Sequence, residues 1–188
     1  MSSCITSATR IGRHVRGVTL VELLVTVAVA AILAMIAVPA MQDTLATRAV
    51  SSSADDLAAA LRQARSEALK RGMPVSVCAT SDPNAASAAC ATVPWTSGWL
   101  VFTDQDANGD LGTGEQLVHV FSGGRSVGSI SEADDNAFVT FAANGLLKDG
   151  THRQWALDPK SGTTDAAKRV VCLNLAGRVK VVKPEDGC

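Results

Sequence analysis

The chain has 188 residues, of which 47% are hydrophobic and 4% aromatic, and its formal net charge is −1 at pH 7. A chain of this length can bury one sizeable hydrophobic core. Its nearly balanced charge excludes a protein that binds nucleic acid through overall charge alone.

The N-terminal region combines a basic leader with a long apolar segment. The leader contains Arg10, Arg13 and Arg16, and the 21 residues of segment 18–38 include one ionisable group, Glu22. At about 1.5 Å per residue, this segment is long enough to cross a roughly 30 Å hydrocarbon core as a helix. A carboxylate within such a helix costs about 2.5 to 3.5 kcal/mol, so Glu22 needs a partner, and a free α-amino group is the obvious one.

The charge distribution gives the segment an orientation. The leader holds three of the 17 basic residues and none of the 18 acidic ones, which leaves 14 against 18 and a formal charge of −4. No basic residue follows the segment before Arg48. This asymmetry places the leader in the cytoplasm and the rest of the chain outside the inner membrane.

The start of the segment carries a recognisable motif. Gly17, Val18, Thr19, an aliphatic pair and then Glu22 with two leucines resemble the type III signal of type IV prepilins and pseudopilins. The resemblance implies that a prepilin peptidase cleaves between Gly17 and Val18 and methylates the new Val18 amine. It also implies that Glu22 acts in filament assembly, and that Pro39 kinks the helix.

Two other interpretations of the segment remain open. A secretory signal peptide could end near residues 37–40, although its apolar part would exceed the usual 7 to 15 residues and would contain a carboxylate. An ordinary single-pass anchor is the second, but it does not require an acid at Glu22. The prepilin interpretation explains both the length and the acid.

The residues after Pro39 predict an α+β fold. Apolar residues recur at helical spacing up to about Arg71, before Gly72 and Pro74, which predicts one helix from Val18 to about Arg71. The β-rich runs that follow are 75–79, 99–103, 116–121, 138–142, 153–157, 170–174 and 179–182. The amphipathic half of the helix is expected to pack on an antiparallel β-sheet. The domain prediction is a leader at 1–17, a transmembrane or filament-core helix at 18–40, and a periplasmic globular domain at 41–188.

Four cysteines remain once the leader, with Cys4, is removed. The sequence-local pairing joins Cys78 with Cys90 and Cys172 with Cys188, although four cysteines allow three connectivities. Disulfides form in oxidising compartments outside the inner membrane, and each short loop would contribute about 3 kcal/mol. A zinc site is the alternative, but no two of these cysteines lie close in sequence.

The residues of the globular part make the resemblance to pilins more specific. The residues that carry it are Ala64 to Ala68, Pro74 to Cys78, Trp95 with Gly98 and Trp99, Val101 with Phe102 and Asp104, Asn108 with Gly109, and Gly177 to Val179. Over nearly the whole mature chain they are similar to the GspH/FimT family of minor pilins, which implies a type IV pilin-like fold. The resemblance implies a subunit that helps initiate or cap a type II secretion pseudopilus or a type IV pilus. Its partners would be other minor and major pilins, the prepilin peptidase and the inner membrane. Some members bind double-stranded DNA during natural transformation, which is the alternative function.

An acidic stretch matches the calcium-binding loop of EF-hands. Its potential ligands are Asp104, Asp106, Asn108, Asp110 and Glu115. Oxygen donors at alternate positions, a glycine for the turn and a terminal glutamate suit calcium. The flanking runs are strand-like rather than helical, so a polar hairpin shaped by Asp, Asn and Gly is the competing interpretation. Calcium is the one cofactor considered, and otherwise none is expected.

Basic residues gather near the C-terminus. They are Lys168, Arg169, Arg178, Lys180 and Lys183. DNA-binding members of the resembled family carry Gly-Arg-x-Arg here, and this chain has Arg178 followed by Lys180. The two side chains would share one face of a strand and could contact phosphate. The competing interpretation is an edge strand whose charges deter sheet pairing.

Enzyme activity has the least support in the sequence. Only His119 and His152 lie outside the leader, and no metalloprotease pattern is present. We therefore expect a structural subunit rather than an enzyme.

Overall fold

A computed structural model of the chain describes residues 17–124, 126–160 and 165–188, without the side chains of 38–40. The predicted leader therefore lies outside the described residues, apart from Gly17. The chain divides after Pro39 into two compact units, an N-terminal unit and a second unit, Ala40–Cys188. Each unit is described by itself.

One helix, α1, spans Leu20–Arg71, with 52 residues, and contributes to both units. It starts two residues later than predicted, because Thr19 caps it by accepting the N–H of Glu22. It ends where predicted, since Gly72 adopts a left-handed φ of 65° and its N–H donates to the carbonyl of Ala68. Helical residues continue on both sides of Pro39, and the kink there stays a prediction.

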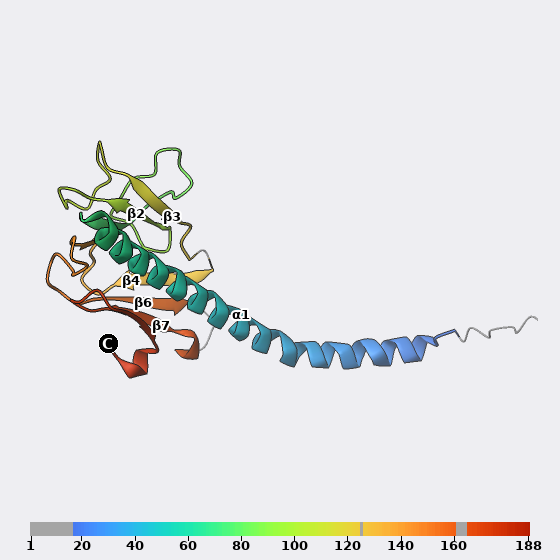
Figure 1. Cartoon of the computed structure of the whole chain (residues 1–188). Helices are drawn as coiled ribbons and strands as arrows, with labels where there is room; N and C mark the ends of the chain where they lie inside the picture. Colours follow the sequence, from blue (N-terminus) through green and yellow to red (C-terminus); the bar gives the residue numbers. More distant parts are fainter. Residues whose placement is uncertain (1–16, 125, 161–164) are drawn as a thin grey trace, which may run out of the picture. The chain divides into compact units, whose positions relative to one another are not determined.

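Eight strands follow in the second unit (Figure 1). They are β1 (Val75–Ala79), β2 (Trp99–Thr103), β3 (Leu117–Phe121), β4 (Val127–Glu132), β5 (Phe138–Phe141), β6 (Arg153–Pro159), β7 (Arg169–Leu173) and β8 (Val179–Val182). Two short 3-10 helices, η1 (Asp165–Ala167) and η2 (Pro184–Asp186), flank β7 and β8. Seven strands match predicted runs within a few residues, and β4 was missed because glycine and serine interrupt its apolar residues.

The strands form two antiparallel sheets where the sequence predicted one. Their orders are β3-β2-β1-β5 and β4-β6-β7-β8. The connections from β3 to β4, from β4 to β5 and from β5 to β6 cross between the sheets. The chain therefore passes between the two sheets three times.

The second half of α1 passes over both sheets (Figure 1). Its buried face joins leucines such as Leu57 and Leu61 with several alanines, and it shares one hydrophobic core with Trp99 of β2 and Trp155 of β6. Alanine side chains let the strands approach the helix closely. This arrangement buries one apolar face of each sheet under a single helix.

The two disulfides lie on the outer sides of the sheets. Cys78–Cys90 ties the loop after β1 over the outer face of its sheet, where Cys78 packs with Leu100 and Phe102. This cover explains why β1 and β2 are buried at every position. Cys172–Cys188 fastens the chain end to β7. The structure therefore contains the sequence-local pairing.

Candidate functional site

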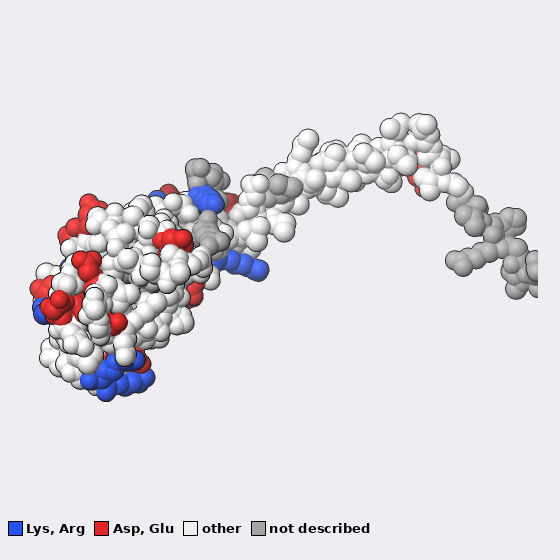
Figure 2. All heavy atoms as spheres, turned by 90° about the horizontal axis from the view of Figure 1, so that it is seen from above, with Lys and Arg blue, Asp and Glu red and all other residues white. Residues whose placement is uncertain are grey.

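The described residues of the N-terminal unit present an exposed apolar surface. Every described side chain from Val18 to Ala37 is exposed, and Val18 itself is 69% exposed. Among the described residues, α1 is the one helix long and apolar enough to cross a membrane. In Figure 2 this part of the chain is almost free of charged atoms, in contrast to the second unit. An apolar surface of this size is unfavourable in contact with water, so a membrane or other subunits must cover it.

Glu22 lies in the first turn of α1. Its backbone N–H donates to Thr19 Oγ1 at 3.2 Å, and the Leu23 N–H donates to the Thr19 carbonyl at 3.1 Å. An acid in this turn also complements the positive end of the helix dipole. The Thr-x-x-Glu spacing is the signal of a capping box, which the sequence reasoning missed.

The carboxylate of Glu22 has no cationic partner among the described residues. The other described residues from Val18 to Ala37 are uncharged, so no cation for Glu22 lies on this part of the chain. Cleavage at Gly17, methylation of Val18 and the assembly role of Glu22 stay predictions.

The structure divides the predicted basic cluster into two groups. Lys168 pairs with Asp165 and Asp158, and Lys183 pairs with Glu185. The Arg169 guanidinium donates to the carbonyls of Ala166 and Lys168. These three cations are therefore engaged within the chain.

The other two cations point outward without an acidic partner. Lys180 lies in the edge strand β8 and Arg178 in the turn before it, and both are exposed on either side of buried Val179. Neither side chain pairs with a carboxylate in the described part of the chain. They are the free cations that this strand offers.

A surface groove of about 370 Å³ places Arg178 next to α1. Its lining, which we call the arginine groove, consists of Arg62, Arg65, Ser66, Leu69, Gly177, Arg178 and Val179. Arg65 donates from Nε to the Gly145 carbonyl at 3.1 Å and from Nη1 to the Gly177 carbonyl at 3.2 Å. Arg65 thus holds two turns against the helix. The sequence does not predict this role, because both carbonyl partners lie far from Arg65 in the chain.

Two arginines one turn apart on α1 provide a direct comparison. We expect Arg65→Gln to lower the free energy of unfolding by about 1.5 to 3 kcal/mol, because two carbonyls lose a charged donor. Exposed Arg62 makes no described hydrogen bond, so Arg62→Gln should change stability by less than about 0.5 kcal/mol. Denaturant unfolding of the full-length chain in mild detergent would measure both. Equal effects of the two substitutions would contradict the assignment.

The acidic loop lies between β2 and β3, as the strand-like flanks predicted. Buried Asp104 accepts hydrogen bonds from Ser76 and from the N–H groups of Asn108 and Gly109. Glu115 accepts from the N–H groups of Gln105 and Gly112, both at 2.8 Å. The loop is therefore closed by its own carboxylates and backbone.

Three of the five predicted calcium ligands come together. Oxygens of Asp104, Asp106 and Glu115 all lie within 4.8 Å of one another. Asn108 turns its amide to Asp106 and its oxygen to the N–H of Asp110, and Asp110 is not part of the group. These contacts are those of a polar turn, and calcium binding stays a prediction.

A melting experiment separates the two interpretations of this loop. If calcium binds, millimolar calcium should raise Tm in the native chain, and the rise should disappear in Glu115→Gln, which loses a bidentate ligand. Magnesium at the same concentration is the control for ionic strength. An unchanged Tm would leave the loop as a hairpin turn without a metal.

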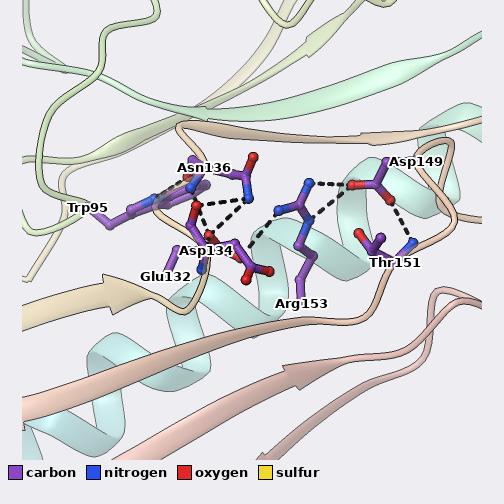
Figure 3. Close-up of polar contacts among 7 residues, drawn as sticks. All are labelled: Trp95, Glu132, Asp134, Asn136, Asp149, Thr151 and Arg153. Atoms are coloured by element: carbon purple, nitrogen blue, oxygen red, sulfur yellow. Dashed lines mark hydrogen bonds and ion pairs between the residues drawn. The ribbon is translucent and has the colours of Figure 1, made fainter.

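A partly buried polar network holds two of the crossovers between the sheets, from β4 to β5 and from β5 to β6 (Figure 3). Glu132, at the end of β4, accepts the N–H groups of Asp134 and Asn136 at 3.0 and 2.8 Å, and it lies 3.5 Å from the Arg153 guanidinium. Arg153 of β6 also pairs with Asp149. The network is structural, because its groups satisfy one another.

The pH dependence of stability should reflect Asp149. Burial raises the pKa of its carboxyl, but the Thr151 N–H and the Arg153 guanidinium outweigh burial and bring the pKa below the ordinary 3.8. A lowered pKa stabilises the fold above pH 3.8, and this contribution is lost as the pH falls through the folded value. We expect the stability difference between the native chain and Asp149→Asn to be constant above about pH 5 and to shrink below it. Urea unfolding at several pH values would test this, and a difference that does not shrink in acid would contradict it.

Comparison with known proteins decides the family. The family model described as type II transport protein GspH matches residues 53–177, which is more than half of the chain. The chain belongs to the GspH family. A second model, the prokaryotic N-terminal methylation motif, matches residues 12–38 and so spans Gly17, Val18 and Glu22. No curated protein matches the chain.

Solved structures agree with the GspH assignment. The chain is similar to the type IV minor pilin FimU of Pseudomonas aeruginosa strain PAO1 in two crystal forms. In one form the identity is 25% over 71% of this chain and 87% of FimU, with a TM-score of 0.55. In the other it is 26% over 70% and 91%, with a TM-score of 0.52.

These findings confirm the predicted family and the predicted fold class. The chain is a member of the minor pilin and pseudopilin family of type II secretion systems and type IV pili, with a long N-terminal helix packed on antiparallel sheets. The family consists of structural subunits rather than enzymes. Its methylation motif and apolar helix indicate membrane anchoring.

Proposed function

We propose that this GspH-family chain is a minor pilin or pseudopilin that helps initiate or cap a type II secretion pseudopilus or type IV pilus. The observation that carries the proposal is the exposed apolar half of α1, which bears a single acid at its start. A closed globular unit joined to such a segment can be held in a membrane and later transferred into a filament core of similar polarity. The globular unit then decides which subunits become neighbours.

Processing makes this transfer possible. The prepilin peptidase cleaves after Gly17 and methylates the Val18 amine, and the amine of a neighbouring subunit then faces Glu22. A cation beside a carboxylate in an apolar core offsets the desolvation that either charge alone would suffer. The partners are accordingly other minor and major pilins, with the chain anchored in the inner membrane before assembly.

The globular unit lies in the periplasm in this proposal. The two disulfides support that location, since they persist in oxidising compartments. The arginines before the apolar segment support the same orientation. The unit enters a periplasmic or extracellular filament together with its helix.

Mass spectrometry of the chain extracted from the cell envelope tests the proposal. The expected N-terminus is a monomethylated Val18, and a Gly17→Asp variant should remain uncleaved. Recovery of the full chain from Met1 in cells with an active peptidase would contradict it. A new N-terminus near residue 40 would instead indicate a secretory signal peptide.

DNA uptake is a second candidate function. The exposed, unpaired side chains of Arg178 and Lys180 favour it, because both can contact phosphate from one strand. Three other cations of the cluster are already engaged, which limits the number of phosphate contacts.

Salt dependence distinguishes a DNA-binding subunit. Two phosphate contacts predict a modest slope of affinity against salt, on the order of −2 in a double-logarithmic plot, and about half of that slope in Arg178→Ala. Double-stranded DNA of random sequence and the full-length chain in detergent are the components. An affinity that does not respond to salt, or to Arg178→Ala, would exclude this function.

A further inference from the structure

We propose that the arginine groove, together with the leucines beside it, docks a segment of another pilin subunit that carries a carboxylate next to apolar side chains. This inference rests on the proposed function, since it names the surface through which the globular unit recognises a neighbour. The surface belongs entirely to the second unit, and it is distinct from the apolar half of α1.

The groove presents two free guanidinium groups. Arg62 comes from α1 and Arg178 from the turn before β8, and both are exposed without an acidic partner in the described part of the chain. Arg65 between them is tied to backbone carbonyls and fixes the geometry of the groove. Free guanidinium groups on a rigid floor bind carboxylates through two parallel hydrogen bonds. Outside the leader acidic residues outnumber basic ones, so this pair is a local exception that calls for an anionic partner.

Exposed leucines continue the surface. Leu69 lines the groove and is 53% exposed, and Leu146 and Leu175 are 45% and 41% exposed. They lie close together, since Leu69 packs on Gly145 and the Leu147 N–H donates to the Leu175 carbonyl. Apolar side chains next to arginines can supply the apolar and the charged contacts of a protein interface.

The position of the surface suits a neighbour that contacts the globular unit alone. Arg62 and Leu69 lie 22 and 29 residues after Ala40 on α1, which is roughly 33 to 44 Å along the helix at about 1.5 Å per residue. The docking surface therefore lies within the second unit and includes no residue of the apolar half of α1.

The composition favours a protein segment over DNA. Duplex DNA is bound through many phosphate contacts and through polar, strongly positive surfaces. The arginine groove offers two free cations, Leu69 lines it, and exposed Leu146 lies beside Leu69. Lys180 does not line the groove.

Photo-crosslinking in cells that assemble the filament tests the proposal. Benzoylphenylalanine is placed at Leu69 or Leu146 of the full-length chain, and the crosslinked products are identified by mass spectrometry. We expect crosslinks to another pilin subunit, reduced at least about tenfold in the double variant Arg62→Glu and Arg178→Glu. Arg48→Glu on the same helix is the matched charge control, because Arg48 is also exposed and forms no ion pair in the described part of the chain. It should leave the crosslinks unchanged.

Probe positions elsewhere on α1 separate the possible outcomes. Leu45 is about as exposed as Leu69, at 54%, but does not line the arginine groove, so a probe there is a control for exposure. Val29 lies in the apolar half of α1, and a probe there reports on filament packing. Crosslinks at Val29 without any at Leu69 would overturn the docking surface and leave the proposed function intact. Absence of crosslinks at both Val29 and Leu69 would overturn the proposed function as well. Crosslinks from Leu69 to DNA, or crosslinks that persist in the double variant, would also overturn the proposal.

Discussion

Replacing Glu22 by leucine is expected to leave the chain in the membrane and to remove it almost completely from the filament. Membrane insertion should not suffer, because the variant no longer places a carboxylate in hydrocarbon. In the filament, however, the methylated Val18 amine of a neighbour loses its counter-ion. Removing one partner of a buried ion pair costs about 3 to 5 kcal/mol, which corresponds to at least a hundredfold loss in association. The amount of subunit in sheared filaments, relative to the membrane fraction, measures the effect.

Two further variants assign the effect to charge rather than to helix capping. Glu22→Gln keeps the size and polarity of the side chain but not its charge, so its incorporation should fall nearly as far as that of Glu22→Leu. Thr19→Ala removes the hydroxyl that accepts the Glu22 N–H, and the loss of a helix cap costs only about 1 kcal/mol. Normal incorporation of Glu22→Leu would mean that the acid is satisfied within its own subunit and has no role between subunits.

The elements that the sequence predicts well are those whose signals are local. The end of α1 follows from Gly72, and the strands from 75 to 79 and from 99 to 103 follow from their apolar runs. Strand β4 is different, because Gly128, Ser129 and Ser131 give it no apolar run. It becomes a strand by pairing with β6, which only the tertiary structure reveals. The division into two sheets depends on the same long-range pairing.

The functional residues also divide into those with a local sequence signal and those that only the fold brings together. The motif around Gly17, Val18 and Glu22 is contiguous and can be read directly from the sequence. The arginine groove brings together Arg62 and Arg178, more than a hundred residues apart, and no local pattern connects them. The sequence also predicts more free cations in the basic cluster than the structure contains. Ion pairs that neutralise a lysine such as Lys168 form only in the folded chain.

Replacing Glu132 by alanine should lower the stability of the globular unit more than any surface change. Glu132 is 5% exposed and serves two backbone N–H groups, the Asn136 side chain and Arg153. Its removal leaves the Arg153 guanidinium, itself largely buried, with Asp149 alone, and leaves the turn after β4 without its acceptor. Breaking a buried pair of this kind costs about 3 to 5 kcal/mol. For a domain of this size, that lowers Tm by about 10 °C or more.

The effect should extend beyond this turn because the network joins the sheets. The carbonyl of Asn136 accepts the indole N–H of Trp95, and the Trp95 ring packs edge-on against Trp155 of β6 at 5.5 Å. Glu132→Gln retains an acceptor and should lose less than half as much stability as Glu132→Ala. Glu185→Ala, which breaks the exposed pair with Lys183, is the matched control and should cost less than about 1 kcal/mol. If thermal unfolding showed Glu132→Ala no less stable than Glu185→Ala, the crossovers would have to be held by the apolar core rather than by this network.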